Sequence, residues 1–318
     1  LVAGLAITNG YFATEVDCKL GCNLALYNGV VSNCVIASGV FPGDGAEFVA
    51  AALSVCKGTV LDSIIRNNEG GGYNGCGVYL TGRGTLSGCV ISNNVHTRNY
   101  DMKGAGITVG TASTISHCII CDNCNSRGDR GCWGGGVYAE AGDFDNCLIA
   151  RNTSGANGGG GVYVNSGTVT FKNCTIVRNK STKGDASKKS KGGGLFIGAT
   201  AKVTLTNCIL IGNEAEEADA TGGMDWSGPL TANCNRLCTF TEVGLNPLVV
   251  EDITKVGFRN PDKNWRIVKS SPCVDVGVDV GYTSDDHDLL GRTRVYNDII
   301  DVGCYEYAPL QGLILFLK

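Results

Sequence analysis

The acidic and histidine side chains, which could act as general acids, bases or ligands, are scattered through this sequence. A glycoside hydrolase needs two facing carboxylates about 5–9.5 Å apart. The candidates for such a pair fall at unrelated positions: Glu69, Asp101, Glu140, Asp143 and Asp145. The three histidines, His96, His117 and His287, give no basis for a Ser-His-Asp arrangement. The sequence therefore predicts no catalytic residues.

One stretch has the residue types of a zinc or iron–sulfur site, namely His117-Cys118-x-x-Cys121-x-x-Cys124. Residues three apart in a strand lie on opposite faces, however, so Cys118 and Cys121 cannot both face one ion. We favour a disulfide instead, either between Cys124 and Cys132 or between Cys121 and Cys124. The Gly-Gly-x-Gly-x-Asp repeat of calcium-binding rolls is also missing. We expect no metal site and no cofactor.

A repeat centred on cysteine organises the chain. Residues 192–213, GGGLFIGATAKVTLTNCILIGN, contain a glycine run, a short apolar strand, a glycine turn, a second strand and Asn-Cys-x-Ile. Copies recur at intervals of 26 to 34 residues, which is typical of a solenoid whose neighbouring coils bury one another's apolar faces. The repeated position is occupied by Cys34, Cys89, Cys118, Cys147, Cys174 and Cys208, with Ser63 in one copy. We expect these side chains to point inward and to stack.

Each copy contains three short strands separated by Gly or Asn bends, as in one coil of a parallel β-helix. Coils stack at about the 4.8 Å spacing of paired strands, so equivalent residues form ladders. The asparagine five positions after the cysteine can adopt left-handed turn geometry and hydrogen-bond between coils. This second predicted ladder contains Asn68, Asn94, Asn123, Asn152, Asn179 and Asn213. A leucine-rich repeat is the rival solenoid, but these copies lack a helical or leucine-dense return segment.

The predicted fold class is therefore all-β: a single-stranded parallel β-helix of about eight coils with a non-repeating C-terminal β tail. We expect the repeats to cover residues 1–238 and a terminating segment, packed on the end of the helix, to cover residues 239–318. The chain begins at Leu1 in mid-coil and without a signal peptide, so we expect a processed or excised form whose first coil has uncovered strand edges.

Composition limits the partners that can be expected. The formal net charge is −4 and the sequence pI is about 5.4. A nucleic-acid-binding surface needs a strong basic excess, so we expect no nucleic-acid partner. No apolar run reaches the ~20 residues of a membrane helix, so we expect no membrane span.

The last part of the chain carries four spaced elements: LNPLVVED, NWRIVKSSPCVDVGVDVG, HDLLGRTR and DIIDVGCYEY. Over roughly residues 244–307 this series resembles the C-terminal part of secreted bacterial right-handed β-helix proteins of the choice-of-anchor Q type, whose repeats are like those of polymorphic outer-membrane proteins. The resemblance implies a right-handed helix, an extracellular or cell-surface location, and a structural role for the dense acidic group, which comprises Asp285, Asp286 and Asp288.

This sequence departs from that family series at Cys273 and Cys304, which replace alanines. If the two strands that carry these cysteines are neighbours, a Cys273–Cys304 disulfide becomes possible, provided that the Cα atoms lie within about 7 Å.

Two further groups are candidates for binding. An outward stripe predicted from Tyr79, Tyr138, Tyr163 and Phe196 could stack sugar rings or could pack between coils under a loop. The apolar segment Leu313, Ile314, Leu315, Phe316 and Leu317 could lie on its own helix or be donated to the first coil of another copy.

These observations favour an extracellular structural or adhesive β-helix, assembling end to end into filaments, with itself or surface glycans as partner. One alternative is a polysaccharide lyase or glycoside hydrolase of the pectate-lyase-like fold, because enzymes use this architecture and fold alone does not give function. The other is a non-catalytic glycan-binding module that uses the aromatic stripe. We favour a protein that is not an enzyme.

Overall fold

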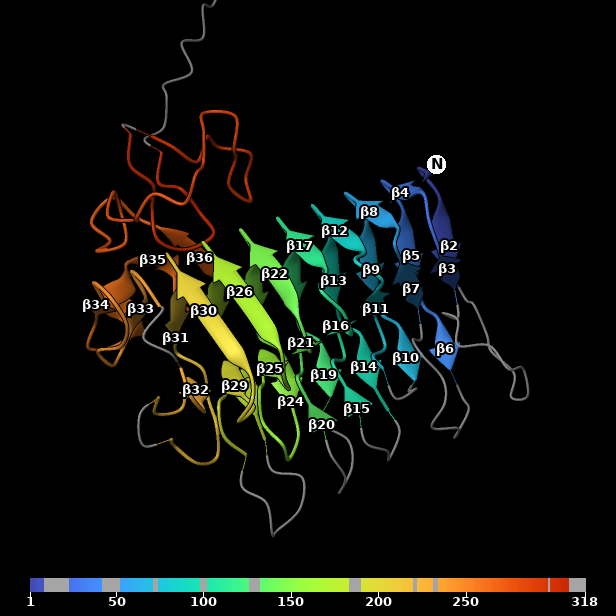
Figure 1. Ribbon diagram of the computed structural model, residues 1–318, viewed down its shortest axis with the longest axis horizontal. Coiled ribbons are helices and arrows are strands. Elements are labelled where there is room, and N and C mark those ends of the chain that lie inside the picture. Colours follow the sequence, from blue (N-terminus) through green and yellow to red (C-terminus); the bar gives the residue numbers. More distant parts are fainter. Residues whose placement is uncertain are drawn as a thin grey trace, which may run out of the picture.

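The structure, a computed structural model, describes residues 1–8, 23–41, 52–70, 74–97, 102–125, 132–182, 190–219, 222–230, 234–296 and 298–308. Within these residues the chain winds into stacked coils, and each coil adds one strand to each of several parallel sheets (Figure 1). We call the sheets I to IV in the order in which a coil passes through them.

Sheet I contains β3 (Leu24–Leu26), β7 (Leu53–Cys56), β11 (Val78–Thr81), β16 (Ile107–Val109), β21 (Val137–Ala139), β25 (Val162–Val164), β29 (Leu195–Ile197) and β32 (Trp226–Ser227). Sheet II contains β1 (Val2–Ala3), β4 (Val30–Ser32), β8 (Thr59–Leu61), β12 (Thr85–Ser87), β17 (Thr114–Ser116), β22 (Gly142–Asp145), β26 (Thr168–Lys172) and β30 (Lys202–Thr206). Sheet III contains β2 (Ala6–Thr8), β5 (Val35–Ala37), β9 (Ile64–Arg66), β13 (Val90–Ser92), β18 (Ile119–Cys121), β23 (Leu148–Ala150), β27 (Thr175–Val177), β31 (Ile209–Ile211), β33 (Cys238–Thr239) and β34 (Leu248–Val249).

Sheet IV was not expected, because the sequence suggested only three strands in each coil. It contains the two-residue strands β6 (Val40–Phe41), β10 (Glu69–Gly70), β14 (Val95–His96), β19 (Cys124–Asn125), β24 (Thr153–Ser154) and β28 (Lys180–Ser181). A separate parallel pair joins β15 (Met102–Lys103) to β20 (Cys132–Trp133). Strands this short carry little periodicity of their own, so an alternating sequence pattern does not reveal them.

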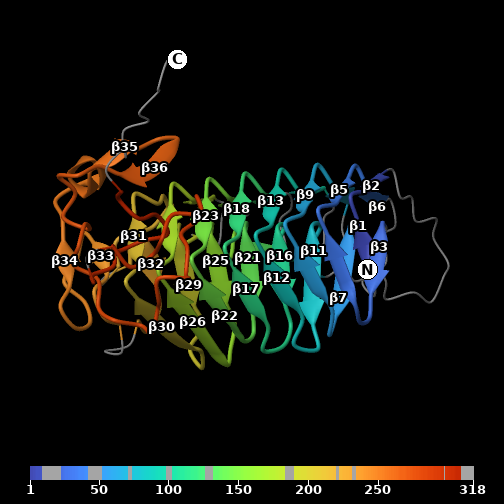
Figure 2. The ribbon, with the colours of Figure 1, turned by 90° about the horizontal axis from the view of Figure 1, so that it is seen from above.

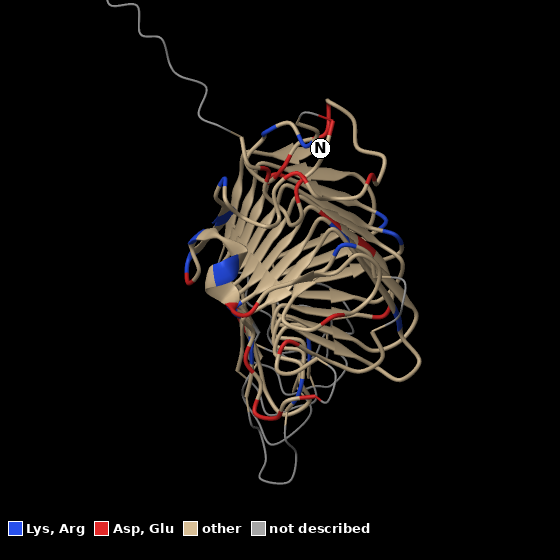
Figure 3. Ribbon diagram, turned by 90° about the vertical axis from the view of Figure 1, so that its left-hand side faces the viewer, with Lys and Arg blue, Asp and Glu red and all other residues tan. Residues whose placement is uncertain are grey.

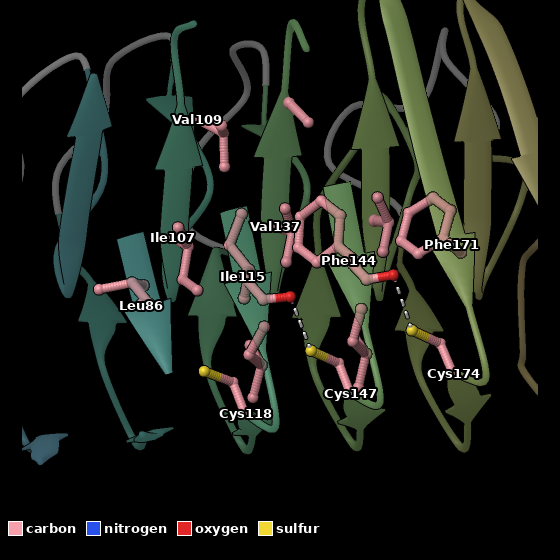
Figure 4. Packing of buried hydrophobic residues seen from close by; sticks show 14 of the residues in the cluster. Leu86, Ile107, Val109, Ile115, Cys118, Val137, Phe144, Cys147, Phe171 and Cys174 are labelled. Atoms are coloured by element: carbon pink, nitrogen blue, oxygen red, sulfur yellow. Dashed lines mark hydrogen bonds between the residues drawn. The ribbon is translucent and has the colours of Figure 1, made fainter. Parts of the chain in front are cut away.

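The core is a column of side chains held in register by the strand pairing. In sheet II one inward row runs through Val31, Val60, Leu86, Ile115, Phe144, Phe171 and Leu205, all with no exposed surface. The rings of Phe144 and Phe171 stack with centroids 4.9 Å apart (Figure 4). Burial of each such side chain stabilises the fold by roughly 1.5–3 kcal/mol. The predicted all-β parallel β-helix is therefore confirmed.

The bends between strands use residues in the left-handed region. Positive φ angles occur just before the repeated cysteine, as at Asn146 and Asn173 (53° and 46°), and again four residues after it, as at Arg151 and Arg178 (53° and 54°). The ladder asparagines one residue further on, such as Asn152, do not have positive φ. The left-handed geometry that these asparagines can tolerate is adopted by the residue before each of them, and the asparagine side chains bond between coils.

Beyond β34 the chain forms a short 3₁₀ helix, η1 (Ile253–Val256), and an antiparallel hairpin of β35 (Phe258–Asn260) and β36 (Asn264–Ile267). We call residues 250–308 the tail. Figures 1 and 2 show the tail beside the last coils, with β35 and β36 next to the outer face of sheet III. There Phe258 and Ile267 share a second buried cluster with Leu148, Val177 and Ile209.

Turn asparagines of successive coils hold the tail along the flank of the solenoid. Asn146, Asn173 and Asn207 donate side-chain hydrogen bonds to the carbonyls of His287 (2.9 Å), Asp301 (2.8 Å) and Val278 (2.8 Å), respectively. The terminating segment therefore contacts the side of the helix, and β33 and β34 continue sheet III past residue 238.

Candidate functional site

A groove of about 320 Å³ lies where the hairpin of the tail meets the outer face of sheet III. We call it the hairpin groove. It is lined by Ile119, Cys121, Leu148, Arg151, Lys263, Asn264, Trp265, Arg266 and Tyr305. Three segments far apart in the sequence therefore build it: the coil flank, the hairpin and the end of the tail.

Contacts with the coil flank hold the hairpin in place. Arg178 donates hydrogen bonds to the carbonyl of Pro261 (3.2 Å) and to the carboxylate of Asp262 (2.6 Å). The guanidinium of Arg151 lies 5.1 Å from the ring centroid of Trp265, whose indole N–H donates to the Pro261 carbonyl at 3.1 Å. These contacts place the cations of the hairpin over the sheet.

The groove carries an excess of positive charge. Arg151 forms a bidentate pair with Asp122 through Nε (2.7 Å) and Nη2 (2.6 Å). Burial opposes ionisation of Asp122, but these hydrogen bonds hold the pKa of its carboxyl below the ordinary value. Among the residues that the structure describes, neither Lys263 nor Arg266 has a carboxylate at ion-pair distance. Two cations are thus left for a ligand, although the whole chain is acidic.

The polar side chains of the groove are hydrogen-bond donors. Burial, reinforced by the nearby Asp122, raises the pKa of the Cys121 thiol to about 12, and burial also raises the pKa of the Tyr305 hydroxyl. Both groups keep their protons at neutral pH; the Cys121 thiol is hydrogen-bonded to Asp122, and the Tyr305 hydroxyl can donate to a ligand in the groove. Guanidinium forks and ammonium groups bind carboxylates and sulfates strongly. The arrangement is therefore suited to holding an anion.

Sequence reasoning did not single out the cations of this groove. Arg151 occupies a turn position that differs from copy to copy, and Lys263 and Arg266 lie in the tail, where the repeat pattern ends. The aromatic-basic run Trp265-Arg266 within NWRIV was the only local signal.

The cysteine ladder lies inside the solenoid, and its thiols also form hydrogen bonds. Cys147 donates to the carbonyls of Ile115 (3.4 Å) and Asp145 (3.3 Å), and Cys174 donates to that of Phe144 at 3.6 Å (Figure 4). Cys34, Cys89, Cys118, Cys147, Cys174 and Cys208 are all at most 1% exposed. Burial raises the pKa of Cys118 and Cys174, so these thiols are neutral and their role is in packing.

The asparagine ladder is a continuous chain of hydrogen bonds. The side-chain amide of each asparagine donates to the side-chain carbonyl of the next, from Asn68 through Asn94, Asn123, Asn152 and Asn179 to Asn213, at 2.8 to 3.0 Å. The chain ends at Asp225, whose Oδ1 accepts from the backbone N and Nδ2 of Asn213, both at 2.8 Å. Asp225 was not foreseen because it belongs to an irregular coil.

Comparison with protein families matches residues 56–235, more than half of the chain, to the right-handed β-helix region. This chain belongs to the right-handed β-helix family. No curated protein matches the sequence. Among solved structures, the β-helix is similar to the crystal structure of pectate lyase Pel9A, at 11% identity and a TM-score of 0.48, over 97% of this chain and 89% of that chain.

The aromatic stripe of the β-helix is interrupted. Tyr138, Tyr163 and Phe196 stack in register with centroids 5.8 and 4.7 Å apart and nearly parallel rings, whereas Thr108 lies between Tyr79 and Tyr138. A sugar ring stacks on the face of an aromatic ring, and here neighbouring rings cover one another's faces. The ammonium of Lys103 also lies 4.6 Å from the Tyr138 centroid.

The β-helix does not form the predicted Cys273–Cys304 disulfide, since both thiols are free. The carbonyl of Cys273 accepts a hydrogen bond from the N–H of Val302, so the backbone pairs Cys273 with Val302. The thiol of Cys273 faces Cys238, whereas the Cys304 thiol interacts with Thr175. Of the 17 cysteines, 15 lie in the described residues, and none of these forms a disulfide, including the expected pairs among Cys121, Cys124 and Cys132.

The acidic and histidine residues are spread over the β-helix. Asp143 and Asp145 accept hydrogen bonds from Thr170 and Tyr282, and Glu140 pairs with Lys103 at 3.3 Å. The Nε2 atom of His117 lies 2.7 Å from the carbonyl of His287, so both residues belong to the contact between coil and tail. His96 is buried, Glu69 is exposed in β10, and Asp101 lies outside the described residues.

The tail contains a buried polar cluster that sequence reasoning missed. Arg294 and Glu306 are at most 1% exposed and pair at 3.3 Å, and Arg294 also donates to the carbonyl of Gly303 at 2.6 Å. Burial raises the pKa of Glu306 to about 9 and that of Asp301 to about 6.

Asp288 accepts hydrogen bonds from the backbone N–H groups of Leu290, Arg292 and Glu306. This cluster holds the tail together, and of the three predicted acidic residues only Asp288 is buried in it.

Charged residues lie mainly in turns and loops of the β-helix, and the strands themselves carry few (Figure 3). No group of three or more potential ligands that could hold a metal ion occurs in the part of the chain that the structure describes. In that part, no helix has the length and apolar character needed to span a membrane. The proposed assembly segment, Leu313 to Leu317, lies outside the described residues.

Proposed function

We propose that this protein is an extracellular adhesive β-helix that binds acidic polysaccharide in the hairpin groove without cleaving it. The single observation that carries the proposal is the lining of the groove, in which Lys263 and Arg266 have no carboxylate partner among the described residues and stand beside the donors Asn264 and Tyr305. A uronate carboxylate or a sulfate ester supplies the acceptor oxygens that such donors need. The resemblance of the tail to secreted β-helix proteins supports an extracellular location.

The stacked coils support an adhesive function because they form a stiff body. Strand pairing, the buried side-chain column and the asparagine ladder fix each coil on its neighbours. A binding groove on such a scaffold keeps its cations in place before the ligand arrives, and less conformational entropy is lost on binding.

The test is calorimetric titration with polygalacturonate, using neutral dextran as the comparison. We expect binding of polygalacturonate alone, weakening as salt screens the charges. The double variant Lys263→Gln/Arg266→Gln should lose about tenfold or more in affinity. The matched control Lys202→Gln/Lys255→Gln changes the net charge equally at exposed positions outside the groove and should bind normally.

Equal loss in both double variants would show that binding depends on net charge alone and would contradict a dedicated site. Release of unsaturated oligosaccharides during the titration, abolished by Lys263→Gln/Arg266→Gln, would replace the adhesive function by that of a polysaccharide lyase.

A further inference from the structure

The outward face of sheet III carries a continuous row of aliphatic side chains. Strand pairing places Val35, Ile64, Val90 and Ile119 in register, and we call these four residues the apolar row. The same line continues through Leu148, Thr175 and Ile209.

The tail covers only the second half of this line. Leu148 and Ile209 are 4% and 1% exposed under the tail, whereas the four residues of the apolar row are partly exposed. Figure 2 shows β35 and β36 beside the later strands of sheet III, with no described segment over β13, β9 and β5. This aliphatic surface is thus buried at one end by the tail, and no segment among the described residues covers it at the other.

The open half begins at the hairpin groove. Ile119 is both the last member of the apolar row and part of the groove lining, together with Arg151, Lys263 and Arg266. A ligand whose anionic group sits in the groove would therefore meet the apolar row directly. Three strand spacings separate Ile119 from Val35, a length of roughly 14 Å.

The width of the row decides what can lie on it. Exposed polar residues flank it on both sides, with Asn33 and Asp62 in the turn before the strands and Arg66 at their other end. A helix or a second copy of the chain would have to cover Asp62 and Arg66, which is costly without matching partners. An extended hydrocarbon chain is about as wide as the apolar row itself, so Asp62 and Arg66 stay in contact with water when it binds.

We infer that the hairpin groove and the apolar row together bind an anionic amphiphile: a carboxylate or sulfate head group between Lys263 and Arg266, with a single acyl chain along Ile119, Val90, Ile64 and Val35. This inference rests on the proposed function and names its ligand more closely, as the acyl-bearing portion of an acidic glycolipid. An acyl chain on the ligand would account for the aliphatic side chains beyond the groove, because an unmodified polysaccharide has no apolar group to bind them.

The experiment compares octanoate with dodecanoate by calorimetric titration below their micelle concentrations. Each added methylene should raise affinity by between about twofold and fourfold, since the row covers one side of the chain. In the double variant Val35→Thr/Val90→Thr, which keeps side-chain shape, dodecanoate should lose most of its advantage over octanoate. The matched control Val30→Thr/Val95→Thr changes two partly exposed valines on sheets II and IV and should keep it.

The outcomes separate this inference from the proposed function. If dodecanoate binds no better than octanoate, or equally well to both double variants, the amphiphile site is wrong, while polygalacturonate binding can still stand. If the chain-length effect depends on Val35 and Val90 but polygalacturonate does not bind, the polysaccharide function fails and the amphiphile site holds. Dimers that Val35→Thr/Val90→Thr abolishes in sedimentation would assign the row to a second copy and overturn the inference.

Discussion

At the scale of single residues, the asparagine ladder ends at a residue whose charge depends on pH. Asp225 is 2% exposed and takes the place where a seventh asparagine would accept from Asn213. Burial raises the pKa of its carboxyl to about 7, although the hydrogen bonds from Asn213 oppose the shift. A carboxylate therefore fits this position less well than a neutral amide.

The sign of the resulting pH dependence follows from this shift. The pKa in the folded protein, about 7, lies above the ordinary 3.8, so between these values the folded protein holds a proton that the unfolded chain has released. The contribution of Asp225 to the free energy of unfolding should therefore be greatest below about pH 4 and fall by roughly 3–4 kcal/mol as the pH rises to about 7.

Asp225→Asn should remove this loss, because the amide oxygen still accepts from Asn213 and carries no charge. Urea unfolding at pH 5 and pH 8 should show the variant more stable than the original protein, and by more at pH 8. Asp285→Asn, at an exposed position, is the control. A variant that is less stable at pH 8 would mean that the ladder requires a carboxylate at its end.

At the scale of the elements, ladders determine how coils are fixed on one another. The side chain of Asn152 takes part in four hydrogen bonds: it donates to Asn179 and to the carbonyl of Ile120, and it accepts from the backbone and side chain of Asn123. All of these groups are buried, so water cannot replace a missing partner.

Asn152→Ala should lower the free energy of unfolding by at least about 3 kcal/mol, because it leaves several buried polar groups without partners. Chemical denaturation followed by circular dichroism measures the loss. Asn165→Ala, which truncates an exposed asparagine between β25 and β26, should change stability by less than about 0.5 kcal/mol. Equal effects at both positions would rule out a stabilising ladder.

At the scale of the whole molecule, one solenoid is stabilised by burial and hydrogen bonding, and the tail adds a second buried cluster on its flank. None of the described cysteines forms a cross-link, and most of them contribute as buried side chains. Ser63 takes the place of the cysteine in one copy of the repeat. Its hydroxyl donates to the carbonyl of Leu61, two residues before it, at 2.6 Å, and the thiols of Cys147 and Cys174 donate to the equivalent carbonyls in their coils. The position therefore suits a small side chain that can donate one hydrogen bond.

The midpoint of thermal unfolding should consequently be the same with and without a reducing agent. A disulfide typically stabilises by 2–4 kcal/mol, which would shift the midpoint by several degrees. Thiol titration of the denatured protein, before and after reduction, provides the control. A lower midpoint under reducing conditions would show that a cross-link contributes to the fold.

The sequence by itself determined the coil. Its repeated Asn-Cys-x-Ile pattern places one residue type at the same point of each winding, so the inward column, the asparagine ladder and the all-β architecture follow from local periodicity. Neighbouring coils contact each other at nearly constant sequence separation, and such contacts can be inferred from spacing alone.

Only the tertiary structure decided where the tail lies and what it builds. The hairpin groove combines Cys121, Arg151, Lys263 and Tyr305, which no repeat relates, and the paired residues Arg294 and Glu306 meet in a segment without periodicity. Cys273 and Cys304, where the sequence departs from the family series, suggested a cross-link, but their thiols interact with Cys238 and Thr175 instead. The docking of a non-repeating segment depends on the complementary shape and charge of two surfaces that are far apart in the sequence. The spacing of neighbouring residues therefore does not predict it.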